Sequence, residues 1–323
     1  MELKNKNILI TGCTGLVGSW LAESLLKENS VFGIAIDDSL NFLLESKNLI
    51  NSFDITYLNI ANFENLHNYF LSRKFSFDIV IHLAAQTQVI DAYENPRKTF
   101  EYNIQGTWNL YEICRVNNIP IINASSDKSY GSTDNLPYKE DHPLNGVHPY
   151  EISKSVGDNL ASSFIKTYNS NITSLRCGNI YGGGDLNWDR LVPGVTKALL
   201  KNDRPVLRSD GSYTRDWVYV EDVSNAYSKV ALNILEGEKV SNFYNFSSKE
   251  YFSVMDIYNE LCLLIHGEIV EPIYEINSEF EIKDQQLDSS KILNELNIEA
   301  SESLSSGLKK TITWYENFLN HNE

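Results

Sequence analysis

Two groups of reactive side chains lie close together near the middle of the sequence. Ser125–Lys128 offers two hydroxyls, a carboxylate and an amine, and it is followed by Tyr150 and Lys154. Tyr150 and Lys154 share one face of a helix because they are four residues apart, and Pro149 suits the first turn of that helix. An ammonium near a phenol lowers the pKa of the phenol. The spacing therefore predicts that Tyr150 is a base for an alcohol or sugar hydroxyl, although Tyr-x-x-x-Lys is also typical of ordinary amphipathic helices.

A glycine-rich segment near the start of the chain predicts a dinucleotide site. The short strand-like run Lys6–Thr11, which is apolar at Ile8–Ile10, leads into Gly12, Gly15 and Gly18, and a helical pattern follows. In this context the glycines allow a tight turn, close approach of the backbone to a pyrophosphate, and close packing of helix on strand. The N–H groups at the start of the helix would then hold the phosphates.

An acidic pair after the second expected strand indicates which dinucleotide binds. The strand covers 31–36 and ends at Asp37 and Asp38, about 20 residues beyond the glycines. A carboxylate at this position accepts hydrogen bonds from the adenosine ribose and repels a 2′-phosphate. The sequence therefore predicts NAD rather than NADP, whereas the alternative for Asp37 is an ordinary turn residue.

Alternating strand and helix patterns predict the fold. Further strands are expected at 55–60, 77–85, 119–124 and 172–177, with helical segments between them. This order is typical of an α/β protein with a Rossmann-type, doubly wound parallel sheet, in which ligands bind at the carboxyl ends of the strands. We expect His82 to be packed inside its apolar strand.

The character of the sequence changes beyond residue 172. Gly182–Gly184 predicts a loop with unusual φ values. Arg190, Arg208 and Arg215 could clamp a diphosphate through bidentate hydrogen bonds, or each could pair with a surface carboxylate. We expect an NAD-binding domain at 1–172 and a smaller C-terminal substrate-binding lobe at 173–323, with some segments returning to the first domain. A final amphipathic helix is expected at 301–318.

Bulk properties narrow the class of protein. The 323 residues are 42% hydrophobic and 11% aromatic, which excludes a disordered chain, and the formal charge of −16 disfavours nucleic acid and anionic membranes as partners. The four cysteines lack metal-type spacing, so we expect no metal and reduced thiols in the cytoplasm. We expect neither a membrane span, since no apolar run approaches about 20 residues, nor a signal peptide.

The motifs together resemble the extended short-chain dehydrogenase/reductase family that acts on nucleotide sugars. Those that carry the resemblance are Thr11–Gly18, Asp37, Leu83–Ala85, Asn103, Ser125–Lys128, Tyr150-x-x-x-Lys154, Arg176-x-x-Asn179 and Arg215–Trp217. Within the family, Gly18–Leu21, Ser125–Lys128, Gly182–Asp185 and Arg190–Pro193 are similar to CDP-glucose 4,6-dehydratases. Ile90–Ala92 and Tyr130–Asp141 depart from their pattern, so the sugar stays open.

The resemblance implies an NDP-hexose 4,6-dehydratase that oxidises C4 transiently with NAD. Tyr150 is then the base, Ser126 relays the proton and Lys154 contacts the ribose. Loss of water across C5 and C6 needs an acid and a base; we expect Asp127 to be the acid, and Lys128 stands where related enzymes place the base. An amine must lose its proton for that role, which requires desolvation or a neighbouring cation.

The resemblance also implies the ligand contacts, a homodimer and two alternatives. The alternatives are an NDP-sugar 4-epimerase or related oxidoreductase, and a non-enzymatic regulator that senses dinucleotides. A CDP-sugar is the favoured substrate. The expected cofactor contacts are Gly12, Thr14, Gly15, Leu16, Val17, Gly18, Asp37, Asp38, Asn59, Ile60, Leu83, Ala84, Ala85, Gln86, Asn103, Ser125, Tyr150, Lys154, Cys177 and Asn179. The expected substrate contacts are Gln86, Asn179, Arg190, Leu191, Val192, Arg208 and Arg215.

Overall fold

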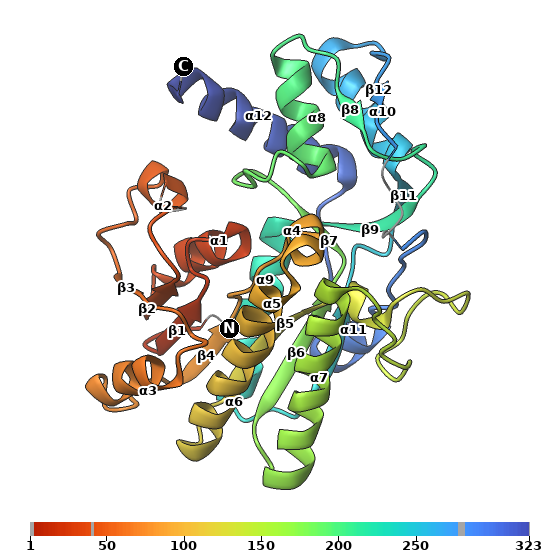
Figure 1. Ribbon diagram of the computed structural model, residues 1–323. Coiled ribbons are helices and arrows are strands. Elements are labelled where there is room, and N and C mark those ends of the chain that lie inside the picture. The colour runs from red at the N-terminus through yellow and green to blue at the C-terminus, as the bar shows by residue number, and fades with distance from the viewer. Residues whose placement is uncertain (1–2, 40–41, 277–281, 323) are drawn as a thin grey trace.

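A parallel sheet with helices on both faces forms the larger part of the molecule (Figure 1). The computed structural model describes residues 3–39, 42–276 and 282–322. Among these residues, seven strands make the sheet in the order β10-β6-β5-β4-β1-β2-β3. They are β1 (Asn7–Thr11), β2 (Ser30–Ala35), β3 (Asp54–Tyr57), β4 (Ile79–His82), β5 (Ile121–Ser126), β6 (Ile172–Cys177) and β10 (Phe243–Phe246).

Helices cover the two faces because the strands carry apolar side chains on both sides. Ile8 and Ile10 of β1 face one core, and Leu9 faces the other. The first core is closed by α1 (Leu16–Leu25), α9 (Val220–Leu235) and α11 (Ser290–Leu296). The second core is closed by α3 (Phe63–Ser72), α6 (Gly106–Val116) and α7 (Pro149–Tyr168). Near-continuous apolar strands are what a parallel sheet covered on both faces requires.

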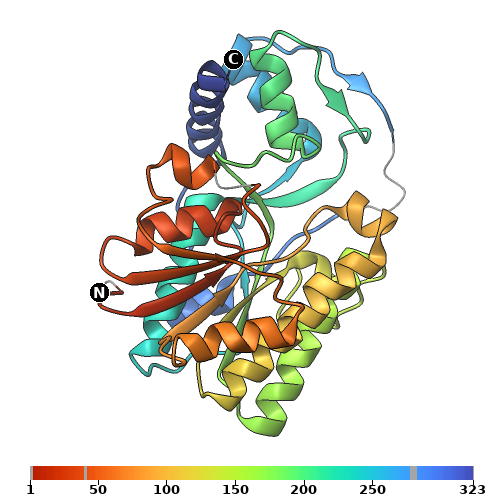
Figure 2. The same ribbon diagram turned by 60° about the vertical axis from the view of Figure 1, so that its left-hand side comes forward.

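The smaller lobe lies beyond the carboxyl ends of the strands (Figures 1 and 2). Its core is formed by side chains of the lobe helices and of a second, small sheet. The helices are α8 (Leu191–Leu200), α10 (Val254–His266) and α12 (Leu304–Asn322), and the small sheet contains β7 (Asn179–Tyr181), β9 (Thr214–Tyr219) and β11 (Tyr251–Ser253). Two strands of two residues each, β8 (Val206–Leu207) and β12 (Ile273–Tyr274), pair with each other and complete the lobe.

Short elements connect the main ones near the carboxyl edge of the sheet. They are α2 (Phe42–Ser46), α4 (Val89–Glu94), α5 (Pro96–Phe100), the π-helical turn η1 (Glu101–Gln105) and the 3₁₀ turn η2 (Asp127–Tyr130). π-helical turns inside helices occur frequently at functional sites. Here η1 joins α5 to α6 and carries Asn103.

The Rossmann-type fold expected from the sequence is confirmed, with differences at the ends of elements. The expected strand 55–60 ends at Tyr57, and the expected strand 77–85 is only Ile79–His82. The strand expected at 119–124 instead continues to Ser126, because Ser125 and Ser126 pair with β6. The final helix covers 304–322 rather than 301–318. After residue 172, β6, β10, α9 and α11 all pack in the larger part of the molecule.

His82 is packed inside the sheet, as expected. It is 2% exposed, and its ring nitrogens lie 2.7 Å from the hydroxyl of Thr11 and 2.9 Å from that of Thr107. Burial lowers the pKa of His82 to about 3, and Lys154 lowers it further. The neutral imidazole therefore links β1, β4 and α6.

No helix among the described residues combines the length and apolar character needed to cross a membrane. All four cysteines are buried and unpaired.

Candidate active site

The glycine loop between β1 and α1 has the backbone geometry that its sequence suggested. Gly12 has a φ of +73°, and a Cβ there would lie 2.8 Å from the backbone of Ala84. A Cβ on Gly18 would collide with the carbonyl oxygen of Gly12, so α1 could not pack as closely. Glycine is therefore required at both positions.

The start of α1 offers free N–H groups to an anion. Gly15 is the N-cap, and no side chain in the described part of the chain caps the helix there. Leu16 and Val17 form its first turn, and Thr14 is buried beside it. Uncapped N–H groups at a helix start bind phosphate well.

The loop Gly182–Gly184 folds over this helix. Gly182 and Gly184 have φ values of +154° and +103°, which confirms the expected unusual backbone. The indole nitrogen of Trp20 in α1 donates a hydrogen bond of 2.8 Å to the carbonyl oxygen of Gly183. The loop is therefore tied to the helix that carries the glycine motif.

The acidic pair lies just after β2, at the carboxyl edge of the sheet. Asp37 is exposed, and its carboxylate accepts hydrogen bonds from the backbone and hydroxyl of Ser39, which lower its pKa. Asp38 is also exposed. Asn59 and Ile60 follow the neighbouring strand β3, and the side chain of Asn59 accepts from the backbone of Ala61. These residues reach the same edge of the sheet as the glycine loop.

The loop Leu83–Gln86 after β4 is held by Asn103. The side-chain oxygen of Asn103 accepts from the backbone of Gln86 at 2.8 Å, and its nitrogen donates to the carbonyl oxygen of Gln86 at 2.9 Å. The same nitrogen donates to the hydroxyl of Ser153 on α7. Asn103 thus joins the loop to the helix that bears Tyr150, and its amide is occupied by protein groups.

Ser125–Lys128 lies where β5 ends and η2 begins. Ser126 accepts a hydrogen bond from the backbone of Lys128 and donates one of 2.9 Å to Asp127 Oδ1. Asp127 is 1% exposed, and its Oδ2 has no partner among the described residues. The Lys128 ammonium lies 3.9 Å from Asp127 Oδ1 and donates to Asn179 at 3.1 Å. Asn179 begins β7, two residues after the buried Cys177.

Tyr150 reaches this cluster from α7. As expected, Pro149 occupies the first turn of that helix, and the carboxylate of Glu151 accepts from two backbone N–H groups before it. Tyr150 forms a hydrogen bond with Ser126. Burial raises the pKa of Tyr150 to about 12, while Arg190 acts in the opposite direction. Additional positive charge near the hydroxyl is therefore needed for Tyr150 to act as a base at neutral pH.

Lys154 lies one turn further along the same helix. Its ammonium donates a hydrogen bond of 2.7 Å to the carbonyl oxygen of Ala124 and lies 5.9 Å from the centre of the Tyr150 ring. Burial lowers the pKa of Lys154 to about 8, and Asp158 and Cys177 partly oppose this. Tyr150 and Lys154 therefore share one helix face, as their spacing predicted.

A buried ion pair between Asp158 and Arg176 holds Ser125 in place. The sequence did not identify this pair as part of the site. Asp158 accepts from Arg176 at 2.7 Å and from the hydroxyl of Ser125 at 2.8 Å. Asp158 is fully buried and Arg176 is 3% exposed. The spacing of Tyr150, Lys154 and Asp158, each four residues from the last, was a signal that could have identified Asp158.

The three arginines have protein partners in this structure. Arg190 pairs with Asp185 at 2.8 Å, and Arg208 pairs with Asp189 at 2.7 Å. Carboxylate pairing is the alternative that the sequence left open for them. Arg215 is 5% exposed and donates to the backbone carbonyls of Thr214 and Lys283.

Of these arginines, Arg190 lies near the reactive cluster. It acts electrostatically on Tyr150, and it also donates to Thr87, next to Gln86. Leu191 and Val192 follow it in the first turn of α8. This segment therefore brings the lobe to the edge of the large sheet.

Two further residues of the site were not predicted from the sequence as site residues, although Asp216 lies within the Arg215–Trp217 motif. The side-chain oxygen of Gln285 accepts from the Lys128 ammonium at 3.3 Å. Asp216 on β9 accepts from the backbones of Ser248 and Leu287. Burial raises the pKa of Asp216 to about 7, and the nearby Asp127 raises it further. Gln285 stands in a polar stretch far along the chain from Lys128, so only the folded chain reveals the contact.

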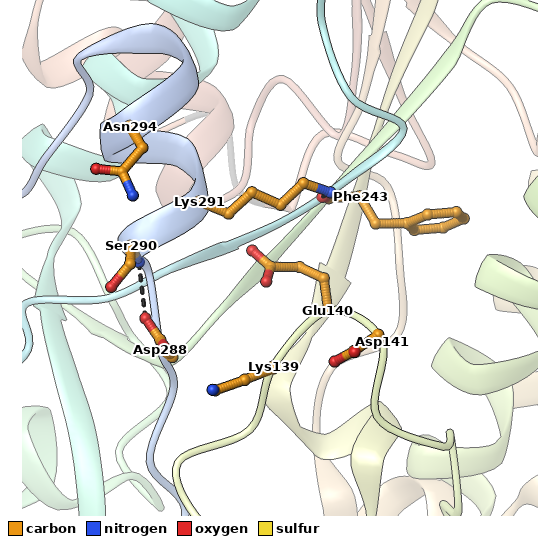
Figure 3. A pocket seen from close by; sticks show the side chains of 8 residues that line it. All are labelled: Lys139, Glu140, Asp141, Phe243, Asp288, Ser290, Lys291 and Asn294. Carbon is orange, nitrogen blue, oxygen red and sulfur yellow. Dashed lines mark hydrogen bonds between the residues drawn. The ribbon is translucent and has the colours of Figure 1, made fainter.

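A separate hollow lies at the β10 edge of the molecule (Figure 3). Its volume is about 520 Å³, and it contains none of the residues predicted from the sequence to form the site. Arg176 connects the two places, because it donates to the carbonyl oxygen of Glu140 and pairs with Asp158. The hollow is lined by Lys139, Glu140, Asp141, Phe243, Asp288, Ser290, Lys291 and Asn294.

The residues at the carboxyl edge fit a bound dinucleotide. The backbone at Gly12 leaves no room for a Cβ, the start of α1 is uncapped, and Asp127 Oδ2 and Gln285 Nε2 are buried polar atoms without a partner among the described residues. Buried polar groups normally have hydrogen-bond partners, so unpaired ones at such an edge indicate a ligand. The site therefore suits NAD together with a polar second ligand.

Curated proteins similar to this chain include dehydratases and an epimerase. CDP-glucose 4,6-dehydratase of Salmonella typhimurium is 29% identical over 98% of this chain and 92% of its own length. A putative UDP-glucose 4-epimerase of Methanocaldococcus jannaschii is 32% identical over 96% of this chain and 98% of its own length. A trifunctional UDP-glucose 4,6-dehydratase/3,5-epimerase/reductase of Arabidopsis thaliana is 29% identical over 97% of this chain, which spans only 47% of that longer protein.

Solved structures show the same fold. UDP-glucose 4-epimerase of Thermotoga maritima with UDP-glucose superposes with a TM-score of 0.88 at 26% identity, covering 97% of this chain and 99% of its own. UDP-glucuronic acid 4-epimerase of Bacillus cereus, in complex with UDP-glucuronic acid and NAD, gives 0.85 at 25% identity, covering 97% and 99%. The model of the NAD dependent epimerase/dehydratase family matches residues 8–245. With the dinucleotide loop and the Ser-Tyr-Lys cluster placed as described, the chain belongs to this family of NAD-dependent enzymes of nucleotide sugars.

Proposed function

We propose that the protein is an NDP-sugar 4,6-dehydratase, which converts an NDP-hexose to the NDP-4-keto-6-deoxy sugar. The observation that carries the proposal is the hydrogen-bonded series Tyr150, Ser126, Asp127, with Lys128 3.9 Å from Asp127. Besides a hydride acceptor, oxidation at C4 needs only a base such as Tyr150. An additional buried carboxylate and an amine supply what elimination needs beyond oxidation.

The first step uses Tyr150 and the groups around it. Tyr150 accepts the proton of the C4 hydroxyl, with Ser126 in hydrogen-bond contact, and the positive charges of Arg190 and Lys154 favour the phenolate. NAD held by the glycine loop would supply reversible hydride transfer, first from C4 and later to C6. The oxidised C4 carbonyl then acidifies C5.

The second step is the loss of water across C5 and C6. It requires one group that takes the C5 proton and one that protonates the departing hydroxyl. Asp127 and Lys128 are adjacent in sequence and in space, and Asp127 Oδ2 is buried without a protein partner. We assign elimination to this pair.

The substrate is proposed to be a CDP-sugar held between the two lobes. The CDP preference is supported by the likeness of Ser125–Lys128 to CDP-glucose dehydratases and by the relative from Salmonella typhimurium. Arg190, Arg208 and Arg215 are the proposed partners of the diphosphate. For Arg190 and Arg208 this requires the diphosphate to replace or share an existing carboxylate partner.

Two further proposals concern the assembly and its location. We infer a homodimer formed through α6 and α7, supported by the exposed Trp108 on α6 and Tyr168 at the end of α7. We place the enzyme in the cytoplasm, supported by four unpaired and buried cysteines.

A 4-epimerase is the second candidate. It is favoured by the relative from Methanocaldococcus jannaschii, at 32% identity over nearly the whole chain. In an epimerase the C4 ketone is reduced again without elimination, so C6 keeps its oxygen and C5 keeps its hydrogen.

The two functions are separated by incubating the purified protein with CDP-, dTDP-, GDP- and UDP-glucose in deuterated water. We expect a 4-keto-6-deoxy product with deuterium at C5, detected by NMR and mass spectrometry. A C4 epimer that retains the C6 oxygen and the C5 hydrogen would instead establish the epimerase.

A further inference from the structure

The Lys128 side chain is surrounded by oxygen atoms. Its nitrogen lies 3.1 Å from Asn179 Oδ1, 3.3 Å from Gln285 Oε1 and 3.9 Å from Asp127 Oδ1. An ammonium has three N–H groups and no acceptor, whereas a neutral amine has a lone pair that none of these oxygens can satisfy. Acceptors around an amine favour its charged form. The surroundings therefore suit a proton donor better than a base.

Gln285 is fixed in this arrangement by its own segment. It is 1% exposed, and its backbone donates to the carbonyl oxygen of Thr214 on β9 at 3.1 Å. Leu287 donates to the carboxylate of Asp216 two residues later. The side-chain oxygen of Gln285 is thus presented to Lys128 by a segment anchored to the small sheet.

We propose that Gln285 is a positioning residue that holds Lys128 as an ammonium. The proposal rests on the proposed dehydratase function. In that reaction Lys128 protonates the departing C6 hydroxyl, and Asp127 takes the proton from C5. This reverses the roles expected from the sequence. Asp127 suits the new role because its buried Oδ2 is an acceptor with no partner in the described part of the chain.

The protons balance in this scheme. Tyr150 gains the proton of the C4 hydroxyl, Asp127 gains the C5 proton, and Lys128 loses one as the C6–O bond breaks and water leaves. The proton on Asp127 exchanges with solvent, and Asp127 then protonates C5 when C6 is reduced. Tyr150 then holds one proton too many and Lys128 one too few. The hydrogen bonds that join Tyr150 to Ser126 and Ser126 to Asp127 lead from Tyr150 to the carboxylate that lies 3.9 Å from the Lys128 nitrogen.

Other titratable groups around the pair must be considered when pH is varied. Those that interact electrostatically with Asp127 are Tyr138 on the loop before α7, Tyr150 on α7, Cys177 on β6 and Asp216 on β9. Because burial raises the pKa of Asp216 to about 7, the overall rate also depends on the charge of Asp216. The charge of Lys128 therefore has to be measured directly.

The test measures the protonation of Lys128 by trace acylation with isotopically labelled acetic anhydride across pH, read by peptide mass spectrometry. Lys128 is accessible to the reagent, with 22% of its side chain exposed. The labelling midpoint is the pH at which the Lys128 amine reaches half of its full reactivity. Gln285→Glu should move this midpoint to higher pH by about one unit, since a carboxylate favours the ammonium. Gln285→Met, which removes the acceptor, should move it to lower pH. Midpoints that stay at the wild-type value in both variants would overturn the proposal.

Gln286→Met is the matched control. Gln286 is the neighbouring glutamine, and its backbone oxygen, which accepts from Tyr138, is kept in the variant. We expect its Lys128 midpoint and its activity to match the wild type. If this variant shifts the Lys128 midpoint as much as Gln285→Met, the effect belongs to the segment and not to Gln285.

The role of the ammonium is tested by following elimination alone. The oxidised 4-keto hexose is supplied to enzyme carrying the reduced cofactor, and release of water is measured against pH. We expect the rate to fall above the labelling midpoint, with the fall moved to higher pH in Gln285→Glu. A rate that rises through the midpoint would make Lys128 the base and refute the assignment. If no nucleotide sugar gives a 6-deoxy product, the proposed function fails, while the labelling still decides whether Gln285 holds the ammonium.

Discussion

At the scale of single residues, the site combines the groups proposed for oxidation and for elimination in one hydrogen-bonded cluster. Ser126 belongs to both, because it contacts Tyr150 and also donates to Asp127. The short span from Ser125 to Lys128 allows one strand end to deliver both groups. A substitution in one group should therefore stop one step while leaving the other measurable.

Asp127→Asn should separate oxidation from elimination. An amide neither accepts the C5 proton nor donates one to the C6 hydroxyl, so dehydration should fall by about 10²-fold or more. We expect absorbance of the reduced nicotinamide at 340 nm to accumulate together with a 4-keto hexose that retains its C6 oxygen. Deuterium exchange at C5 should be lost if Asp127 is the base. Dehydration at the wild-type rate would remove the main support for the dehydratase and favour the epimerase.

Tyr150→Phe removes one oxygen and should block the first step. Without the phenol there is no base for the C4 hydroxyl, so turnover should fall by at least about 10²-fold. Nucleotide-sugar binding, measured by calorimetry, should stay within a few-fold of the wild type because the ring remains. Full activity in this variant would exclude Tyr150 as the base.

At the scale of elements, the site depends on contacts that tie loops to rigid strands and helices. The π-helical turn η1 places the Asn103 amide between the Leu83–Gln86 loop and α7. His82 ties β4 to β1 and α6 through two hydroxyls. Both contacts lie within the sheet and helices that carry the proposed catalytic side chains.

The neutral, buried His82 should make stability depend on pH. Its pKa is about 3 in the folded protein and about 6.5 in the unfolded chain, so the unfolded chain binds the proton first as pH falls. Stability from this residue is full above pH 6.5 and is lost as pH falls toward 3. Between about pH 8 and about pH 5 the free energy of unfolding should drop by about 2 kcal/mol from His82 alone.

Urea unfolding of the wild type and of His82→Gln at several pH values measures this contribution. Glutamine can still bond the neighbouring hydroxyls but does not titrate. The variant should therefore lack about 2 kcal/mol of the acid-dependent loss, whatever its stability at pH 7. Identical pH dependence in the two proteins would show that His82 is not kept neutral.

At the scale of the whole molecule, the second lobe closes over the carboxyl edge of the large sheet. The chain crosses between the two parts at several places: β6 leads into β7, and β9 leads into α9. Gln285 and Asn179 come from segments tied to the small sheet, and both contact Lys128 on the large one. Movement between the two parts would therefore alter the surroundings of Lys128.

The proposed homodimer gives a prediction at this scale. Trp108 on α6 is 53% exposed. A charge at this position would be buried between the α6 and α7 surfaces of two subunits, so it should prevent them from associating. Sedimentation velocity should find a dimer for the wild type at micromolar concentration and mainly monomer for Trp108→Glu. Tyr274→Glu, at a 49% exposed aromatic residue in the other lobe, is the control and should remain dimeric. A wild-type monomer at that concentration would refute the dimer.

The sequence by itself determined the features that are local along the chain. The glycine loop, the helix that carries Tyr150 and Lys154, and the delivery of Ser125–Lys128 by a strand end each depend on a few neighbouring residues. Backbone propensity and side-chain periodicity act over this range, so these elements were predicted within a few residues. The order of strands and helices fixed the Rossmann-type class for the same reason.

The tertiary structure alone decided which distant groups meet. Gln285 contacts Lys128 across 157 positions, and the Asp158 carboxylate meets Arg176 and Ser125 from three different elements. Arg190 pairs with Asp185 and Arg208 pairs with Asp189, and no sequence motif indicated these partners. Such contacts depend on how helices and sheets pack, and packing is set by the summed burial of many side chains rather than by any local pattern. In the proposed mechanism the charge of Lys128, and with it the direction of proton transfer, is therefore set by folding.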